Sequence, residues 1–276
     1  MLHEPIKLSV TRVNAGVLAC TILTLLAAEP ALSKTQAADL AGAAIAQAVA
    51  DSSRPASDTA RDVNRKPVDT LAFAGVKPGD KIADYAAGGG YFTRLFAAVV
   101  GPTGHVYASV PSPLFKYPNI VKGIAEVQTY AATHPNVTVT FASALDAAKY
   151  SEKLDVFWIS QNYHDLHDSF MGPVDMAAFN RMVYAALKPG GIYLVLDHVA
   201  AKGSRPDVTD TLHRIEPSTV RQEVEASGFT YEGESTVLAN PADPHTAGVF
   251  DPSIQGRTDQ FILKFRRPRA TPITSR

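Results

Sequence analysis

A dense group of polar side chains follows an apolar segment near the middle of the chain. Residues 154–159 are mostly hydrophobic, and residues 160–168 then bring two histidines, two aspartates and an asparagine. His164 and His167 are three positions apart, so on a helical turn they would share one face. With a pKa near neutrality, the imidazole of His164 could act as a general base, with Asn162 as a substrate contact.

The same polar group has two other interpretations. Its side chains could cap the next helix and face solvent, or His164 could be a metal ligand. Unpaired histidine and aspartate side chains are more often solvated than ligating, so we assign no metal site. We predict that Asn162 and His164 contact a substrate, and the sequence leaves the capping role open.

Three consecutive glycines occupy positions 88–90. The preceding residues 82–85 predict a short buried strand, and residues 91–100 predict an apolar helix. A strand, a glycine turn and a helix in this order open nucleotide-binding α/β folds. Glycine tolerates a positive φ and lets the backbone approach a ligand, and the helix that follows points free N–H groups at the turn. We predict a ligand-binding turn, and a plain tight turn is the alternative.

The dinucleotide fingerprint G-x-G-x-x-G is a competing interpretation of this turn. Gly88 and Gly90 fill its first two glycine positions, but Thr93 stands at the third. The fingerprint also expects an acid at the end of the second strand, and the strand predicted at 106–110 ends without one. A nicotinamide-dependent reductase is therefore disfavoured.

The rest of the chain alternates between strand-like and helical patterns. Further strands are predicted at 137–141, 154–160 and 192–197, and further helices at 120–133, 174–187 and 217–227. This alternation predicts an α/β fold with a doubly wound, mostly parallel sheet and helices on both faces. Two strand-like runs, 230–238 and 258–265, end the domain with no helix between them, which fits an antiparallel hairpin.

Two segments resemble motifs of class I S-adenosylmethionine-dependent methyltransferases. Residues 76–84, followed by the glycine turn and residues 91–93, are similar to the first motif of that family. Residues 187–195 are similar to its loop into the fifth strand. The resemblance covers residues 63–265 and looks closest to bacterial exported methyltransferase-like proteins of unassigned substrate. It implies a seven-stranded sheet of order 3-2-1-4-5-7-6 with an antiparallel C-terminal strand.

The resemblance also implies a function. It suggests S-adenosyl-L-methionine as the cofactor and methyl transfer to an unidentified small-molecule or envelope acceptor. Such transfer needs alignment and exclusion of water more than covalent help from the protein. Because function does not follow from fold alone, the alternative is a non-catalytic module that binds a nucleoside-like ligand on the same scaffold.

Ligands of this fold lie outside the C-terminal ends of the strands. By resemblance, the glycine turn passes under the methionine part of the cofactor, and Asp84 orders the turn or meets the amino group through water. A carboxylate that only accepts turn N–H groups is the alternative role. The family usually has an acid after the second strand, where Ser109 stands, and often another after the third. The implied cofactor contacts are Asp84, Ala86, Gly88, Gly89, Gly90, Ser109 and Asp146.

The fold implied by the resemblance also places other polar residues. The fourth and fifth strands are neighbours in it, so His198, which follows the fifth, should approach His164. A buried histidine bonded to backbone is the alternative for His198. Helices before the first strand cover the pocket in this family. Arg61, Asp62 and Arg65 could therefore face the ligand, although surface ion pairs are equally expected.

The N-terminal residues 1–33 have the three parts of a signal peptide. Lys7 and Arg12 precede an apolar run at 15–28, and small residues follow at the positions that a signal peptidase reads. We expect export to the periplasm or beyond, with an uncleaved membrane anchor as the alternative. Cys20 is the only cysteine. The mature chain would therefore have no disulfide, thiolate metal site or cysteine nucleophile.

The remaining boundaries and partners follow from composition. Residues 34–57 are an alanine-rich leader or linker, residues 58–268 form the methyltransferase-like domain, and 269–276 form a tail. The formal net charge is -1, and the chain lacks the excess of basic residues that would suggest a nucleic-acid partner. We expect a small-molecule or envelope substrate, and membrane contact only through an uncleaved signal segment.

Overall fold

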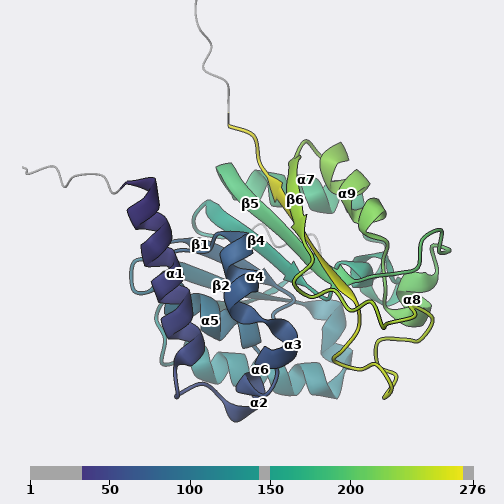
Figure 1. Cartoon of the computed structure of the whole chain (residues 1–276), viewed down its shortest axis with the longest axis horizontal. Helices are drawn as coiled ribbons and strands as arrows, with labels where there is room; N and C mark the ends of the chain where they lie inside the picture. Colours follow the sequence, from purple (N-terminus) through teal and green to yellow (C-terminus); the bar gives the residue numbers. More distant parts are fainter. Residues whose placement is uncertain (1–32, 143–149, 270–276) are drawn as a thin grey trace, which may run out of the picture. The chain divides into compact units, whose positions relative to one another are not determined.

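The computed structural model describes residues 33–142 and 150–269, and its core is a seven-stranded sheet (Figure 1). The strand order is β3-β2-β1-β4-β5-β7-β6. The strands are β1 (Lys81–Tyr85), β2 (His105–Pro111), β3 (Val137–Ala142), β4 (Leu154–Ser160), β5 (Leu187–His198), β6 (Thr230–Ser235) and β7 (Gln260–Arg266). Pairs among β1 to β5 are parallel, whereas β7 is antiparallel to both β5 and β6. The predicted fold class and strand order are confirmed.

Helices cover both faces of this sheet. They are α1 (Lys34–Ala50), α2 (Ala56–Thr59), α3 (Asp62–Arg65), α4 (Pro67–Ala74), α5 (Tyr91–Val100), α6 (Pro118–Ala131), α7 (Met176–Ala186), α8 (Val208–Leu212) and α9 (Pro217–Ala226). Three short 3-10 helices are η1 (Ser112–Lys116), η2 (His164–His167) and η3 (Ser169–Met171). Among the described residues, no helix combines the length and apolar character needed to cross a membrane.

Side chains of the central strands belong to two hydrophobic clusters, one on each face of the sheet. Phe157 packs with residues of α7 and α9, and the next residue, Trp158, packs with residues of α1, α4 and α5. Both side chains are fully buried. Successive side chains of a strand point to opposite faces, so a strand covered on both sides must be apolar throughout. This explains why residues 154–159 form a nearly continuous hydrophobic run.

Helix α1 is part of this domain rather than a leader outside it. Ile45 and Ala48 are 2% and 4% exposed and join the cluster that contains Leu71 and Phe96. The sequence pattern did not show this because alanine spacing gives little amphipathic contrast. The boundary expected at residue 58 therefore moves to Lys34, where α1 begins.

Strand β5 is longer than predicted. Residues 187–191 were expected to end a helix and form a loop, but Leu187 pairs with Leu154 before a register shift. Gly190 has a φ of 85°, and a Cβ on Gly191 would lie 2.9 Å from the Lys188 carbonyl oxygen. The two glycines allow the irregular start of the strand.

Candidate functional site

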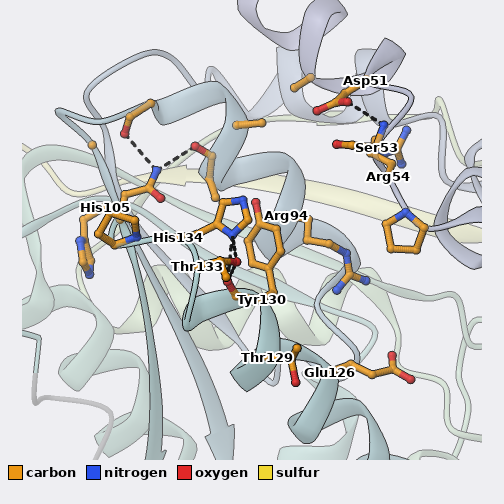
Figure 2. Close-up of a pocket in the computed structure, with 18 of the residues that line it drawn as sticks. Asp51, Ser53, Arg54, Arg94, His105, Glu126, Thr129, Tyr130, Thr133 and His134 are labelled. Carbon is orange, nitrogen blue, oxygen red and sulfur yellow. Dashed lines mark hydrogen bonds between the residues drawn. The ribbon is translucent and has the colours of Figure 1, made fainter.

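Two hollows are candidates for a ligand site. The larger, of about 1310 Å³, lies beside the starts of β1 and β2, and Figure 2 shows its lining. Two of its polar residues contact each other. The His134 ring stacks on Tyr130 with ring centres 3.7 Å apart, and His134 Nδ1 lies 2.8 Å from the Tyr130 carbonyl oxygen. Doubly wound sheets bind ligands at the other ends of their strands, so we do not place the site here.

The second cavity, of about 580 Å³, lies at the C-terminal ends of β1, β4 and β5. The glycine turn after β1 lines one part of it. Asn162 and His164, which follow β4, line another part together with His198 at the end of β5. Three segments far apart in the sequence therefore converge where this fold binds ligands.

The glycine turn contains two different kinds of glycine. Gly88 has a φ of 55°, and a Cβ added there would come no closer than 4.0 Å to another protein atom. Its open face lines the cavity. At Gly90, with a φ of 79°, a Cβ would lie 2.6 Å from Cγ2 of Val127. Gly90 does not line the cavity, so its surroundings support packing rather than the expected cofactor contact.

Helix α6 packs directly against the glycine turn. A Cβ on Gly123 would lie 3.0 Å from both Cα and N of Gly89. The helix can approach so closely only because neither residue has a side chain. Gly89 and Ala86 both line the cavity, and Ala86 has a φ of 58°, which is uncommon for a residue with a Cβ. The packing of α6 therefore fixes the turn in its shape.

Asp84, the last but one residue of β1, lines the cavity and is only 3% exposed. It accepts a hydrogen bond of 2.6 Å from the Thr93 hydroxyl. Burial raises the pKa of Asp84 from 3.8 to about 6, and the Thr93 hydrogen bond and the charge of Arg65 offset only part of this. Thr93, which breaks the dinucleotide fingerprint, is thus the partner of the buried acid. An ionised Asp84 can bind a cationic group of a ligand.

Two arginines from the N-terminal helices line the same cavity. Arg61 and Arg65 lie over the Tyr91 ring, 5.2 and 4.7 Å from its centre. Asp62 instead accepts two hydrogen bonds of 2.7 Å from Arg54, and one of 2.6 Å from the Tyr91 hydroxyl. Burial and the nearby Arg61 lower the pKa of Arg65 to about 10, so it remains a cation at neutral pH.

A chain of hydrogen bonds links Arg65 to His198. Arg65 Nη2 donates to Gln161 Oε1 at 3.0 Å, and Gln161 Nε2 donates to Gln260 Oε1 at 3.1 Å. Gln260 Nε2 in turn donates to the Thr258 hydroxyl at 3.2 Å, and this hydroxyl lies 2.7 Å from His198 Nδ1. Because the hydroxyl already accepts one hydrogen bond, we assign its proton to Nδ1, which leaves Nε2 protonated. Burial lowers the pKa of His198 to about 3, so the neutral ring offers a donor.

His164 lies between two carboxylates. Asp197, which is fully buried, accepts hydrogen bonds from His164 Nδ1 at 2.8 Å and from its backbone N–H at 2.9 Å. On the other side, Nε2 lies 3.2 Å from Asp165 Oδ1. Burial alone would lower the pKa of His164, but the two carboxylates outweigh it and raise the pKa to about 10. In this arrangement the ring is protonated at neutral pH, which does not fit the general-base role predicted from the sequence.

The other predicted site residues differ in whether they line the cavity. Asn162 lines the cavity, and its Nδ2 donates to Asp165 Oδ2 at 2.7 Å. Ser109 is buried, accepts a hydrogen bond of 3.0 Å from the Thr140 hydroxyl and is not among the residues that line the cavity. Asp146 lies outside the described residues.

His213 is a site residue that the sequence analysis missed. It follows the short helix α8, has a φ of 54° and lines the cavity. The centre of its ring lies 5.5 Å from the centre of the His164 ring. The ring centres of His164 and His198 are 6.0 Å apart. The helix is too short to give a periodic pattern. No local signal in the sequence connects His213 with the polar residues after β4.

Solved structures with the same architecture include known methyltransferases. A SAM-dependent methyltransferase from Aquifex aeolicus matches with a TM-score of 0.52 and 17% identity over 82% of this chain and 98% of that chain. This chain has the class I methyltransferase fold. An arsenic(III) S-adenosylmethionine methyltransferase from Chlamydomonas reinhardtii matches with a TM-score of 0.50 and 15% identity, over 82% and 73% of the two chains.

Sequence relatives point to the same class. A ubiquinone/menaquinone biosynthesis C-methyltransferase from Ectopseudomonas mendocina is 31% identical over 135 residues, which are 46% of this chain and 45% of that protein. The corresponding enzyme from Burkholderia vietnamiensis is 55% identical over 38 residues, 14% and 16% of the two chains. The matches thus span less than half of these curated relatives. No protein-family model matches the chain.

Proposed function

We propose that this chain is an S-adenosylmethionine-dependent methyltransferase whose acceptor is a small molecule or a component of the cell envelope. One observation carries the proposal. The open face of Gly88 and the carboxylate of Asp84 lie in one cavity with Asn162 and His198, at the edge of the sheet where this fold binds ligands.

The residues around the glycine turn fit the donor. When bound, the donor supplies a methyl group already activated on a sulfonium. The turn offers backbone that a ligand can approach at Gly88, and ionised Asp84 suits a cationic amino group. Arg65 supplies the charge for a carboxylate. Asn119, at the start of α6, is the polar side chain on this side of the cavity that suits the ribose hydroxyls in place of Ser109.

The other end of the cavity suits the acceptor. His198 presents Nε2–H, and Asn162 lines the same cavity, so both can orient an acceptor that has oxygen or nitrogen atoms. Tyr117 and Phe170 add apolar surface to the cavity, which helps to exclude water from the reacting atoms. The curated relatives take part in ubiquinone or menaquinone biosynthesis, and the Chlamydomonas enzyme methylates arsenic(III). We transfer neither acceptor to this chain.

The test is calorimetric titration of the mature chain with S-adenosylhomocysteine, and separately with NAD. We expect one site for S-adenosylhomocysteine and none for NAD. Gly88→Ala should weaken binding by about tenfold or more, because the methyl group enters the ligand side of the turn. Gly203→Ala is the matched control, since Gly203 also has a positive φ of 76° and open space around it.

Two results would contradict parts of this proposal. Equal affinity in wild type and a folded Gly88→Ala variant would show that the ligand lies elsewhere. Tight binding with no methyl transfer to any acceptor fraction, followed with a methyl-labelled donor, would favour the non-catalytic binding module.

A further inference from the structure

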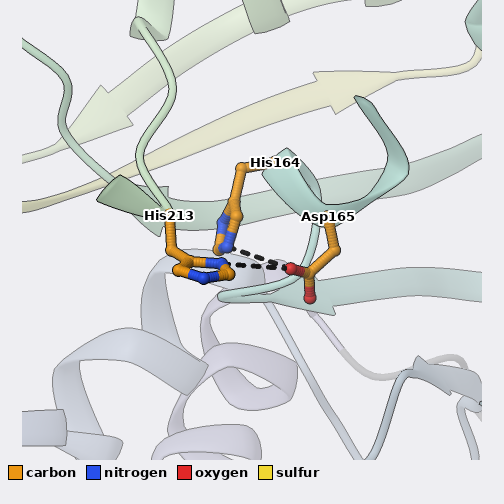
Figure 3. Close-up of side chains that lie close together, drawn as sticks. All are labelled: His164, Asp165 and His213. Atoms are coloured by element: carbon orange, nitrogen blue, oxygen red, sulfur yellow. Dashed lines mark ion pairs between the residues drawn. The ribbon is translucent and has the colours of Figure 1, made fainter. Parts of the chain in front are cut away.

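Three metal-ligating side chains meet at one end of the cavity. His164, Asp165 and His213 each offer a ligand atom, and these atoms all lie within 4.8 Å of one another. Figure 3 shows the two rings and the carboxylate turned toward a common point. We propose that these three residues bind a divalent first-row transition metal ion, such as Zn²⁺, which holds the methyl acceptor through an oxygen or sulfur atom. The acceptor role depends on the proposed function, whereas metal binding itself does not.

The distances suit a small metal ion. His164 Nε2 lies 3.2 Å from Asp165 Oδ1, and His213 Nδ1 lies 3.7 Å from the same oxygen. Ligand atoms of a tetrahedral zinc site are about 3.3 Å apart when the bonds to the metal are about 2.0–2.1 Å long. The two distances from Asp165 Oδ1 to the histidine nitrogens are therefore within a few tenths of an ångström of those in such a site.

The outer contacts leave the correct atoms facing inward. Asp197 accepts from His164 Nδ1, which directs Nε2 of the same ring toward the common point. Asn162 donates to Asp165 Oδ2, which leaves Oδ1 toward the two histidines. A carboxylate that orients a ligating histidine through its second nitrogen is a recurrent feature of protein metal sites.

The charges around the cluster favour a cation. Asp165, Asp168 and Asp197 are all buried, at 7%, 1% and 0% exposed. Both carboxylate oxygens of Asp168 are buried, and neither has a donor within hydrogen-bond distance among the described residues. Asp168 Oδ2 lies 3.9 Å from His213 Nδ1, so this acid faces the same ring nitrogen that would bind the ion.

A protonated His164 alone accounts for less of the geometry. It satisfies Asp197 and Asp165, but it leaves His213 Nδ1 at 3.7 Å from Asp165 and 3.9 Å from Asp168, beyond hydrogen-bond distance of both. His213 is also held in the left-handed conformation, which costs energy for a residue other than glycine. A bound cation gives a reason for both features.

The ligand types indicate the class of ion and its role. Two imidazoles and one carboxylate suit zinc or iron(II), whereas calcium and magnesium prefer oxygen ligands. Three protein ligands leave a coordination position open. All three residues line the cavity, so the open position can take an ionisable hydroxyl or thiol of the acceptor.

The test is titration of the mature chain with Zn²⁺ alone, in the absence of any methyl donor. We expect one equivalent to bind, and we expect His213→Asn and Asp165→Asn each to weaken the affinity by about 100-fold or more. Asparagine tolerates the left-handed backbone at His213, so this variant keeps the fold. Asp197→Asn should weaken binding by about 10- to 100-fold through the orientation of His164.

The matched control is His167→Asn. His167 lies on the same 3-10 helix as His164 but pairs with Glu223 at 3.2 Å, away from the cluster. We expect its Zn²⁺ affinity to equal that of wild type, with circular dichroism and the thermal midpoint as folding checks. Co²⁺ should give the visible absorption of a four- or five-coordinate site in wild type and lose it in His213→Asn.

The absence of stoichiometric Zn²⁺ binding in wild type, or an equal loss of affinity in His167→Asn, would overturn the metal site. These outcomes are separate from a failure of the proposed function. Binding of S-adenosylhomocysteine without Zn²⁺ binding removes the metal site only. Zn²⁺ binding without S-adenosylhomocysteine binding keeps the metal site and removes the methyltransferase proposal.

Discussion

We propose that donor binding depends most directly on Asp84. Its pKa is raised to about 6 because it is buried, so the charged form is disfavoured in the protein without ligand. The raised pKa contributes stability that is fully present below the unfolded pKa of about 3.8 and is lost as the pH rises through about 6. A cationic ligand group beside Asp84 would offset the free-energy cost of ionising this buried carboxyl group. Ionised Asp84 therefore lowers the stability of the protein without ligand and favours binding of the donor.

We predict that donor affinity depends on pH through Asp84. The ionised acid binds the donor, so the affinity for S-adenosylhomocysteine should rise as the pH increases through about 6 and level off above it. At pH 5 it should be about tenfold weaker than at pH 7. Asp84→Asn should bind weakly at every pH and have a higher thermal midpoint at pH 7. The same pH dependence in the variant would show that another group is responsible.

Thr93 provides a second prediction at this scale. Thr93→Val preserves the shape of the side chain but removes the hydrogen bond to the buried carboxylate. The free energy of unfolding at pH 7 should fall by about 1–3 kcal/mol. The midpoint of the pH dependence of donor binding should move upward, because the ionised acid loses its donor. Calorimetric titrations from pH 5 to 8 would detect the shift, and an unchanged midpoint would contradict it.

Some site residues could be predicted from the sequence, and others could not. Asp84 and Gly88 lie in a local strand–turn–helix pattern, and their placement needed no long-range information. Gly90 belongs to the same pattern, yet its role is decided by contact with Val127 in α6. His213 depends on a left-handed residue after a short helix, which leaves no periodic signal in the sequence.

At the scale of elements, α6 holds the glycine turn in place. Gly90→Val should lower the free energy of unfolding by about 2–4 kcal/mol, because its Cβ would overlap Val127 and its φ is positive. Gly88→Ala should cost only about 1–2 kcal/mol, from its positive φ. Urea denaturation of the two variants would test this difference. Equal destabilisation would contradict the separate roles of the two glycines.

Helix α1 provides the second prediction for an element. Ile45→Ala should lower the free energy of unfolding by about 2–4 kcal/mol, because Ile45 is buried against the core of the domain. Leu40→Ala, on the same helix but 52% exposed, should change it by less than about 0.5 kcal/mol. Denaturant titration compares the two. Similar small effects would mean that α1 is the loosely attached leader that the sequence suggested.

At the scale of the whole molecule, the fold was the most predictable feature. The alternation of apolar strands and helices depends on burial on both faces of the sheet, and residues 154–159 show that burial directly in the sequence. Some features that depend on contacts between distant segments were not predictable. They include the packing of α1 on the core and the approach of Gly123 to the glycine turn.

We propose that the chain functions after export from the cytoplasm. Its N-terminal segment has the pattern of a signal peptide, and the first helix of the domain begins at Lys34, next to the expected cleavage site. N-terminal sequencing of protein from the native host should find a mature chain that starts near Lys34 in the periplasmic fraction. An intact Met1 in the cytosolic fraction would refute export.

The central claim is that the donor binds at the C-terminal ends of β1, β4 and β5, against the glycine turn. A crystal structure of the mature chain with S-adenosylhomocysteine tests it most directly. We expect density for the ligand over Gly88 and beside Asp84, in the cavity that also contains His198. Density in the larger hollow, beside Tyr130 and His134, would contradict it.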